Sequence, residues 1–548
     1  METVAQKLIK RFGVLKSEHS KWTGIWNDCA RYCFPNAAPV STFTDKTRGN
    51  PKRQPIDTTG VACLTKLAAW LYSSTIFQGE QWFDLKAHKK THGDIEVEDT
   101  QLDRFLQKAA RKGLEAIANS NCVQVYQQFL RGYCAFGTGA FYSEFNDDDE
   151  LVCRQWNISD CVYIAENSKG MVDTVFRGFE YTARQAVQEF GYNNVSEDIR
   201  KAYDNPEEKE KRFVFIHAVF PRQERDKRKS NPKNKQWASI YIDEKAQKIV
   251  EEGGYDTFPY QVPRFYNTDE IYGRSPAMSA IPALRSINIA IWAYLKNVEG
   301  QSKPIVFAPS DKYDRMSLEL GSINPWDSQD GDVKLWSPTG DLRSPLDFAA
   351  QKKEEVQGIF YNDVFQYLED RKNMTATEAQ LRYDEMIQGI APVLANLHSE
   401  FFAPFIRRVI LGLVERGKIV VPKLYRGKDG KMPDFEVVYN TRLDTKLKGV
   451  LNANVVNFIR MVGELAVAMA NAPLAAAYID TDKVVKAYAR NNNVSNDALK
   501  SDDEIAEALQ AMGQQQQQQQ LLGMLDKVNL QKTPEEGSMQ DTIVNGIR

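Results

Sequence analysis

The stretch 373–416 constrains the fold of this chain more than any other stretch. Near its start, Thr375 and Glu378 have the spacing of a capping box, in which each side chain satisfies one free N–H group of the first helical turn. Apolar residues then follow the spacing of one helical face: Leu381, Ile387, Ile390, Leu394, Leu397, Phe401, Phe405, Val409 and Leu413. This pattern predicts one long helix with a single buried stripe.

Two prolines inside this long helix predict that it bends. Pro392 and Pro404 each remove a backbone N–H group and clash with a carbonyl one turn earlier, so we expect a kink at each. Gly417 can then adopt the left-handed conformation that ends many helices. Because such a helix is far longer than the mean of roughly 11 or 12 residues, we expect domains or subunits to share it.

Length and composition indicate a globular protein of several units. The chain has 548 residues, of which 42% are apolar, and a prior of roughly 150 residues per unit suggests three or four units. The formal net charge of −3 excludes no class of partner, because basic groups can gather on one face. The longest uncharged apolar stretch, 465–479, contains Pro473 and is shorter than the roughly 18–20 residues of a membrane span. Since no basic and apolar leader follows Met1, we expect a soluble, intracellular protein without a membrane partner.

The order of periodicities predicts an α+β, helix-rich fold. Helical spacing covers 3–33, which we expect to form one helix, and then 57–71, 99–119 and 123–136. After Gly137-Thr138-Gly139 the apolar period becomes two, which predicts a β-rich unit. Its expected strands are 140–145, 151–156, 163–165, 172–181, 213–220 and 237–243, and Thr182 is placed to cap a short helix between them.

Two further helices bracket a small insertion that is rich in Pro and Gly. Ser275 is placed to cap the first helix, which extends to 299, and Pro276 suits its first position, where no N–H group is needed. The second helix spans 346–368. Between them, 305–308 and 333–336 are expected strands, and a short polar loop at 369–373 leads from the second helix to the long helix.

Motifs of catalysis and of metal or cofactor binding are absent from the sequence. No phosphate loop, dinucleotide fingerprint, zincin motif or nucleophile elbow occurs. The seven cysteines include no Cys-x-x-Cys pair, and the five histidines are scattered, so we expect reduced thiols, no metal site and no cofactor.

Two charged segments keep alternative functions open. The acidic run 147–150 could hold Mg²⁺, and 222–235 holds seven Lys or Arg against two acids. Both segments also suit ordinary solvated turns. A metal-dependent nucleic-acid enzyme and a monomeric DNA-binding module therefore remain alternatives.

Three motifs occur in an order that resembles a known family. They are Ala165-Glu-Asn-Ser-Lys-Gly170 leading to Arg177, Tyr272-Gly-Arg-Ser-Pro276, and Met374-Thr-Ala-Thr-Glu378 followed by Pro392 and Pro404. Over roughly residues 5–510, the chain is similar to the head-to-tail connector, or portal, proteins of short-tailed bacteriophages. The resemblance implies a non-enzymatic, dodecameric ring at one vertex of the capsid in the virion. Double-stranded DNA would pass through its channel, and its partners would be the terminase, capsid and scaffolding proteins, and tail adaptor proteins.

The same resemblance implies a division of the chain. Its parts would be a wing (1–274), stem helices (275–299 and 346–368), a clip (300–345), a tunnel loop (369–375), the long kinked helix with the wing return (376–440), a crown (441–512) and a Gln-rich mobile tail (513–548).

The residues expected to act in this arrangement are few. Arg371, Lys372 and Asn373 of the tunnel loop would contact DNA phosphates through charge, although a solvated loop is the other interpretation. Lys352 and Lys353 would lie on the channel face of the stem. Trp326 and Trp336 would anchor the clip interface, unless they are core residues.

Overall fold

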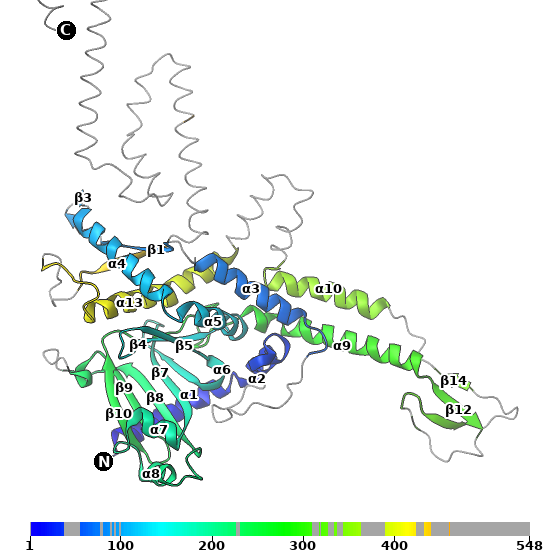
Figure 1. Cartoon of the computed structure of the whole chain (residues 1–548). Helices are drawn as coiled ribbons and strands as arrows, with labels where there is room; N and C mark the ends of the chain where they lie inside the picture. Colours follow the sequence, from blue (N-terminus) through cyan, green and yellow to red (C-terminus); the bar gives the residue numbers. More distant parts are fainter. Residues whose placement is uncertain are drawn as a thin grey trace, which may run out of the picture. The chain divides into compact units, whose positions relative to one another are not determined.

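The computed structural model describes residues 2–37, 55–76, 81–87, 90–92, 95–97, 100–225, 231–309, 317, 319–326, 334–336, 343–362, 389–423, 432–439 and 460 (Figure 1). The chain divides into two units, Met1–Thr441 and Arg442–Arg548. Every element below belongs to the first unit, so the proposed crown and tail lie outside the described residues, apart from residue 460. Within the described part, no helix combines the length and the apolar character needed to cross a membrane.

A five-stranded antiparallel sheet forms the β-rich unit that the sequence predicts. Its strands lie in the order β10-β9-β8-β7-β6, so each pairs with its neighbour in the chain. Their bounds are β6 (Val162–Glu166), β7 (Val172–Thr182), β8 (Arg212–Pro221), β9 (Trp237–Asp243) and β10 (Lys248–Tyr255). The edge strand β10 is an addition to the predicted set.

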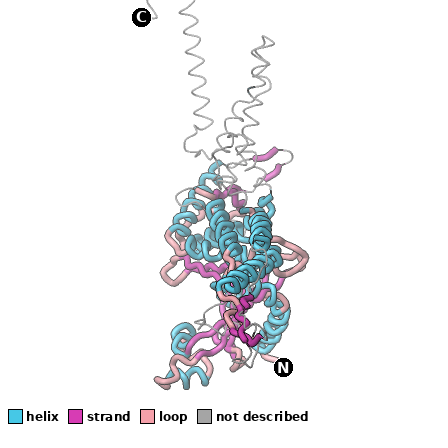
Figure 2. Tube along the Cα trace, turned by 90° about the vertical axis from the view of Figure 1, so that its right-hand side faces the viewer, coloured by secondary structure: helices cyan, strands magenta, loops and turns pink. Residues whose placement is uncertain are grey.

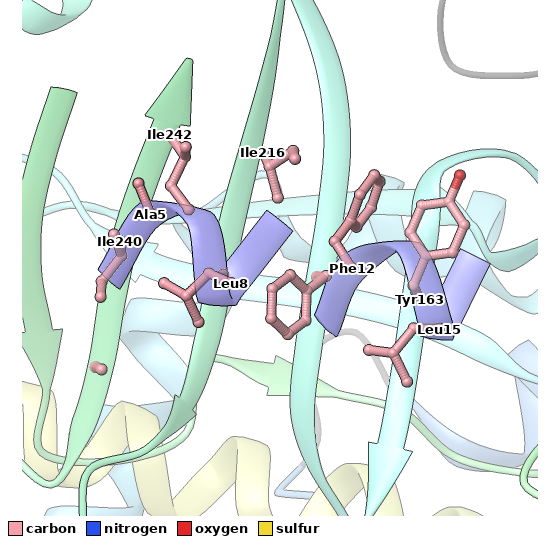
Figure 3. Packing of buried hydrophobic residues seen from close by; sticks show 11 residues of the cluster. Ala5, Leu8, Phe12, Leu15, Tyr163, Ile216, Ile240 and Ile242 are labelled. Carbon is pink, nitrogen blue, oxygen red and sulfur yellow. The ribbon is translucent and has the colours of Figure 1, made fainter. Parts of the chain in front are cut away.

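The first helix, α1 (Val4–Ser20), covers one face of this sheet. In Figure 3 its buried residues Leu8, Phe12 and Leu15 point at the strands and meet Tyr163 and Ile216. Phe12 contacts Tyr163 edge to face, with ring centroids 4.9 Å apart. Residues spaced by three or four along a helix can reach every strand of the sheet, which explains the helical period of this segment.

Two short helices cover the opposite face, so the sheet is enclosed between helices (Figure 2). They are α7 (Ala183–Phe190) and α8 (Glu197–Asp204). Thr182 accepts a hydrogen bond from Gln185 N–H and forms the full capping box of α7, which confirms the predicted cap. Because neighbouring strand residues point to opposite faces, Phe215 packs under α7 while Ile216 packs under α1.

A second, three-stranded sheet lies against a layer of helices. Its order is β11-β4-β5, with β4 (Gly139–Phe145), β5 (Leu151–Asn157) and β11 (Tyr260–Gln261). The helices are α2 (Thr23–Tyr32), α3 (Thr59–Thr75), α4 (Thr100–Ala118), α5 (Cys122–Phe136), α9 (Pro276–Ser302), α10 (Arg343–Ile359) and α13 (Ala403–Glu415). Helices and an antiparallel meander together confirm the predicted α+β, helix-rich class.

Two predicted helices have different bounds in the structure. The segment 3–33 is two helices rather than one, because the chain turns at Lys21 and Trp22 between α1 and α2. The helix predicted at 346–368 begins at Arg343 and ends at Ile359, where a turn follows and Tyr361 adopts a left-handed φ of 59°. Residues 363–388 lie outside the described part.

The described part of the long helix runs from residue 389 to Glu415 and contains one wide turn, η5 (His398–Phe402), of π type. The predicted stripe residues from Ile390 to Leu413 are buried, and Phe401 stacks on Phe129 of α5 with ring centroids 5.0 Å apart. Gly417 has a φ of 70°, which confirms the left-handed stop. The predicted capping box at Thr375 and Glu378 lies outside the described residues.

Smaller elements complete the unit. The insertion between α9 and α10 contains a sheet in the order β13-β12-β14. The bounds of these elements are α6 (Ile158–Cys161), β1 (Phe83–Ala87) paired with β15 (Phe435–Tyr439), β2 (Lys90–His92) paired with β3 (Ile95–Val97), β12 (Ile305–Pro309), β13 (Ile323–Trp326), β14 (Lys334–Trp336), η1 (Pro35–Ala37) and η2 (Pro232–Asn234).

Candidate functional site

The start of α9 is fixed to the helical layer by its cap. Ser275 Oγ accepts a hydrogen bond from Met278 N–H at 3.1 Å, and its hydroxyl donates to the carbonyl of Ala135 at 2.9 Å. Pro276 occupies the first turn, where its missing N–H group costs nothing. Ser275 is fully buried, so one side chain both caps α9 and ties it to the end of α5.

A close backbone approach strengthens this junction. Gly137 ends α5 with a φ of 75°, and a Cβ atom on it would lie 2.2 Å from the carbonyl oxygen of Gly273. Thr138 Oγ1 accepts a hydrogen bond from Gly273 N–H at 2.8 Å. Two motifs that are far apart in the sequence, at 137–139 and 272–276, therefore pack directly on each other and need glycine to do so.

The α9–α10 pair, with α10 lying beside α9, leaves the core and carries the insertion at its far end (Figure 1). The first half of α9 is buried through Ala277, Ile281 and Leu284. In the second half, Ile289, Trp292 and Leu295 are 67%, 53% and 48% exposed. We call these three residues the α9 stripe, since they recur every three residues on one helix.

Polar contacts hold α10 and α9 to the start of α3. Lys353 pairs with Asp57 at 2.6 Å, and Asn288 Oδ1 accepts hydrogen bonds from the N–H groups of Ile56 and Asp57 at 2.9 and 3.2 Å. Burial alone would raise the pKa of Asp57, but hydrogen bonds from Lys353 and Thr59 bring that pKa below its usual value. Lys352 pairs with Glu355 at 2.6 Å. Both lysines expected on a channel face therefore have carboxylate partners within the chain.

The insertion exposes apolar residues at its strands. Trp336 and Leu335 of β14 and Ile323 of β13 are exposed, while Ile305 of β12 is buried. Trp326 is the last residue of β13 and lies beside Pro309 in the parallel pairing of β13 with β12. An exposed tryptophan on a small sheet is typical of a contact surface.

A buried arginine joins three distant segments. The Arg264 guanidinium group pairs with Glu166 of β6 and with Glu400 of η5, where its Nη2–Oε1 distance is 2.7 Å. Its Nη2 also donates to the carbonyl of Gly170 at 2.7 Å, and its backbone N–H donates to Glu400 at 2.8 Å. Its side chain is 3% exposed. Burial raises the pKa of Glu166 despite the opposing charge of Arg264. We call Arg264, Glu166 and Glu400 the joint.

The two residues that follow Arg264 contact Tyr361, which precedes the segment 363–388 in the sequence, and Asn396, which follows it. The hydroxyl groups of Tyr266 and Tyr361 lie 2.7 Å apart, and Asn396 donates to the carbonyl of Phe265 at 3.4 Å. Tyr361 follows α10, and Asn396 lies on the long helix. The short segment 264–266 therefore holds the end of α10 and the long helix at one place on the β-rich unit. Sequence patterns missed this arrangement, because its members are widely separated along the chain.

The remaining predicted residues form no reactive constellation in the described part of the chain. Asp149 pairs with Arg416 at 2.8 Å, and Lys418 donates to the Asp149 carbonyl at 2.7 Å, so one carboxylate of the acidic turn is held in an ion pair within the chain. No group of three or more metal-ligating side chains occurs among the described residues. Arg177 is buried between Trp156 and Phe179, at 4.3 and 4.2 Å from their ring centroids. Arg371, Lys372 and Asn373 lie outside the described residues.

Most described cations of the basic loop are paired as well. Arg222 and Lys233 both reach Glu252, at 3.2 and 3.3 Å, and Lys235 reaches Asp256 at 3.4 Å. These contacts make the described part of the loop a hairpin end braced on β10. They give no support to a nucleic-acid enzyme built from the acidic turn and this loop.

Comparison with known proteins identifies the family. The profile of the bacteriophage head to tail connecting protein matches residues 5–499. The chain is 26% identical over 538 residues to the probable portal protein of Bordetella phage BPP-1, with 96% of this chain and 94% of that protein covered. It is 25% identical over 540 residues to the portal protein of Salmonella phage epsilon15, with 95% and 94% covered.

These findings confirm the resemblance inferred from the ordered motifs. Portal proteins are structural rather than enzymatic, and they form the oligomeric ring at the capsid vertex of the virion that links head and tail. A non-catalytic chain with an exposed apolar helix and an exposed small sheet agrees with that function. The chain belongs to the bacteriophage head-to-tail connecting protein family and is a phage portal protein.

Proposed function

We propose that the α9–α10 pair is the stem of the portal ring and that the α9 stripe packs against the neighbouring subunit. The observation that carries this proposal is the exposure of Ile289, Trp292 and Leu295 on a helix that has left its own core. Burying one large apolar side chain contributes about 1.5–3 kcal/mol, so an uncovered stripe is costly. Leu346 and Phe348 of α10 are also exposed and offer an apolar surface for the stripe of the next subunit. A contact between two different surfaces repeats around a ring until it closes.

The other parts of the chain take the places that the resemblance implies. The stem comprises 275–299 and 346–368, the clip 300–345, and the wing 1–274. The long kinked helix and wing return follow at 376–440, the crown at 441–512 and the mobile tail at 513–548. We propose a dodecamer whose channel admits double-stranded DNA without sequence preference. Its partners are the terminase motor, capsid and scaffolding proteins, and tail adaptor proteins, and Trp326 and Trp336 serve the clip contacts.

The first experiment tests the stripe as a subunit contact. Ile289→Glu with Trp292→Glu places two charges on the stripe, and we expect the purified chain to elute as a monomer with unchanged helix content in circular dichroism. The matched control is Val14→Glu with Met171→Glu, because these two residues are also apolar and exposed but lie outside the stem. Rings of normal size from the stripe variant would exclude the stripe from the interface.

The second experiment tests the tunnel loop, 369–375. In a ring, the copies of Arg371 and Lys372 converge and repel unless a polyanion lies among them, so DNA phosphates are favoured there. Arg371→Ala with Lys372→Ala should leave ring assembly intact and shorten the genome retained per particle in a complementation assay. Lys7→Ala with Arg11→Ala removes two exposed charges from α1 as a control. Full-length genomes in particles built from the loop variant would contradict the DNA contact and favour the interpretation of 369–375 as a solvated loop.

A further inference from the structure

Helix α4 has one buried face and one basic face. Leu106, Ala109, Ala110 and Ile117 are buried, and the helix packs on β1 and α13. The exposed positions follow the opposite side of the helix and carry four cations and one acid: Arg104, Lys108, Arg111, Lys112 and Glu115. We call the four cations the α4 basic face.

The spacing of three of these cations creates like-charge pairs along the helix. Lys108 lies four residues from both Arg104 and Lys112, and like charges at this spacing destabilise a helix by about 0.2–0.5 kcal/mol per pair. Among the described residues, no carboxylate pairs with Arg104 or Lys108, and Lys112 donates only to a backbone carbonyl, that of Lys418, at 2.6 Å. A polyanion would convert this repulsion into attraction.

On three other exposed helices, a lysine pairs with an acid about one turn away. Lys201 pairs with Glu197 at 2.8 Å, Lys296 with Glu299 at 2.9 Å, and Lys352 with Glu355 at 2.6 Å, all at a spacing of three or four residues. On α1, Lys10 pairs with Glu2, and Arg11 contacts Thr174 at 3.3 Å. Among the described residues, Arg104 and Lys108 of α4 lack a carboxylate partner of this kind.

We propose that the α4 basic face binds the phosphate backbone of double-stranded DNA outside the channel. Long, exposed cationic side chains in a row along one helix fit a contact that neutralises phosphates. In Figure 1, α4 lies at one end of the first unit and the strands β12 and β14 at the other. The location rests on the proposed function: if the insertion is the tail-facing clip, α4 faces the head, where the packaged genome lies.

The test uses rings of the full-length chain and covalently closed circular duplex DNA, which has no end to thread through a closed ring. The variant Arg104→Gln, Lys108→Gln and Arg111→Gln keeps good helix formers in place and removes three charges. The slope of log affinity against log salt concentration should become shallower by about 2.7, from roughly 0.9 per lost phosphate contact. The control Lys7→Gln, Lys10→Gln and Arg11→Gln removes three charges from α1 and should leave the slope unchanged.

Three results would overturn the proposal. They are an unchanged slope in the α4 variant, an equal loss in the α1 control, and normal DNA binding combined with poor incorporation of rings into capsids, which would assign the face to an acidic capsid protein. The assay requires no passage of DNA through the channel, so its result is independent of the tunnel-loop experiment. If sizing showed no ring, the stem proposal would fail, and the same comparison of variants on the monomer would still decide the role of the α4 basic face.

Discussion

At the scale of single residues, a histidine sits deep in the β-rich unit without a charge of its own. The His217 ring stacks on Tyr241 with centroids 4.1 Å apart, and its nitrogens lie 3.2 Å from the Tyr260 hydroxyl and 3.0 Å from Ser239 Oγ. Burial lowers the pKa of His217 well below its usual value, and the charge of Arg177 on the next strand lowers it further. The folded β-rich unit therefore holds a neutral His217.

This environment predicts that the folded chain becomes less stable as the pH decreases. The pKa of His217 in the folded chain lies below its value of roughly 6.5 in the unfolded chain. Above about pH 6.5 the histidine is neutral in both states. As the pH falls below about 6.5, the unfolded chain binds a proton more readily than the folded chain, so protons favour unfolding. The free energy of unfolding should fall by up to about 1.4 kcal/mol per pH unit for each such histidine. Burial also lowers the pKa of His19, which adds to the same trend.

His217→Gln keeps hydrogen-bonding groups beside Tyr260 and Ser239 but cannot titrate. Thermal unfolding of this variant should lose less stability between pH 7 and pH 5 than the wild type, with the remaining loss due in part to His19. Melting curves at several pH values measure the effect. Identical pH dependence in the two proteins would show that His217 is not the titrating group.

At the scale of elements, the joint explains how the long helix is attached to the β-rich unit. In η5, Ala403 N–H bonds to the carbonyl of His398, five residues back, just before Pro404, which has no N–H group to offer. This wide turn presents Glu400 to Arg264. The wide turn lies just before Pro404, and its Glu400 side chain ties the long helix to β6 through Arg264.

Removing one partner of the joint should loosen this attachment. For Glu400→Ala we expect a loss of about 2–3 kcal/mol in unfolding free energy, below the roughly 3–5 kcal/mol of a fully buried pair because Glu166 still faces Arg264. Amide hydrogen exchange within 389–402 should accelerate. Asp434→Ala, which removes the partner of the exposed Arg407, is the control and should cost about 1 kcal/mol or less. Equal exchange in both variants would contradict a special role for the joint.

The elements also show what the sequence could predict. Strands β4 to β9 alternate or run apolar between clear turns, so local patterns identify them. Strand β10 was not predicted, because Gly253, Gly254 and its charged residues weaken the alternation of apolar residues in this edge strand. Strand β1 escapes because its partner β15 lies at the far end of the unit. The break between α1 and α2 has no Gly or Pro, so the apolar period crosses it without a signal.

The joint could not be predicted for a related reason. Glu166 lies in a motif that the sequence had singled out, and Glu400 lies on the long helix, yet no local pattern connects either to Arg264. Likewise, the sequence shows Lys353 only as a basic residue on a helix, which suits a channel face. The fold shows that Asp57 is its partner. Pairing between distant segments depends on packing, which periodicity does not encode.

At the scale of the whole molecule, the order of motifs identified the family, while the function of each part stays a proposal. The portal assignment rests on the match over residues 5–499 and on relatives covered nearly end to end. The stem, clip and tunnel loop rest on the exposed α9 stripe, on the exposed strands of the insertion and on the basic loop before the long helix. These proposals share one requirement, a closed ring with the α9–α10 pair around its axis.

An electron-microscopy reconstruction of the purified full-length chain tests that requirement most directly. We predict closed rings with a central hole, the α9–α10 pairs surrounding the hole, and Trp292 covered by the neighbouring subunit. Particles without a hole, or rings in which these helices point outward and Trp292 stays in solvent, would contradict the account.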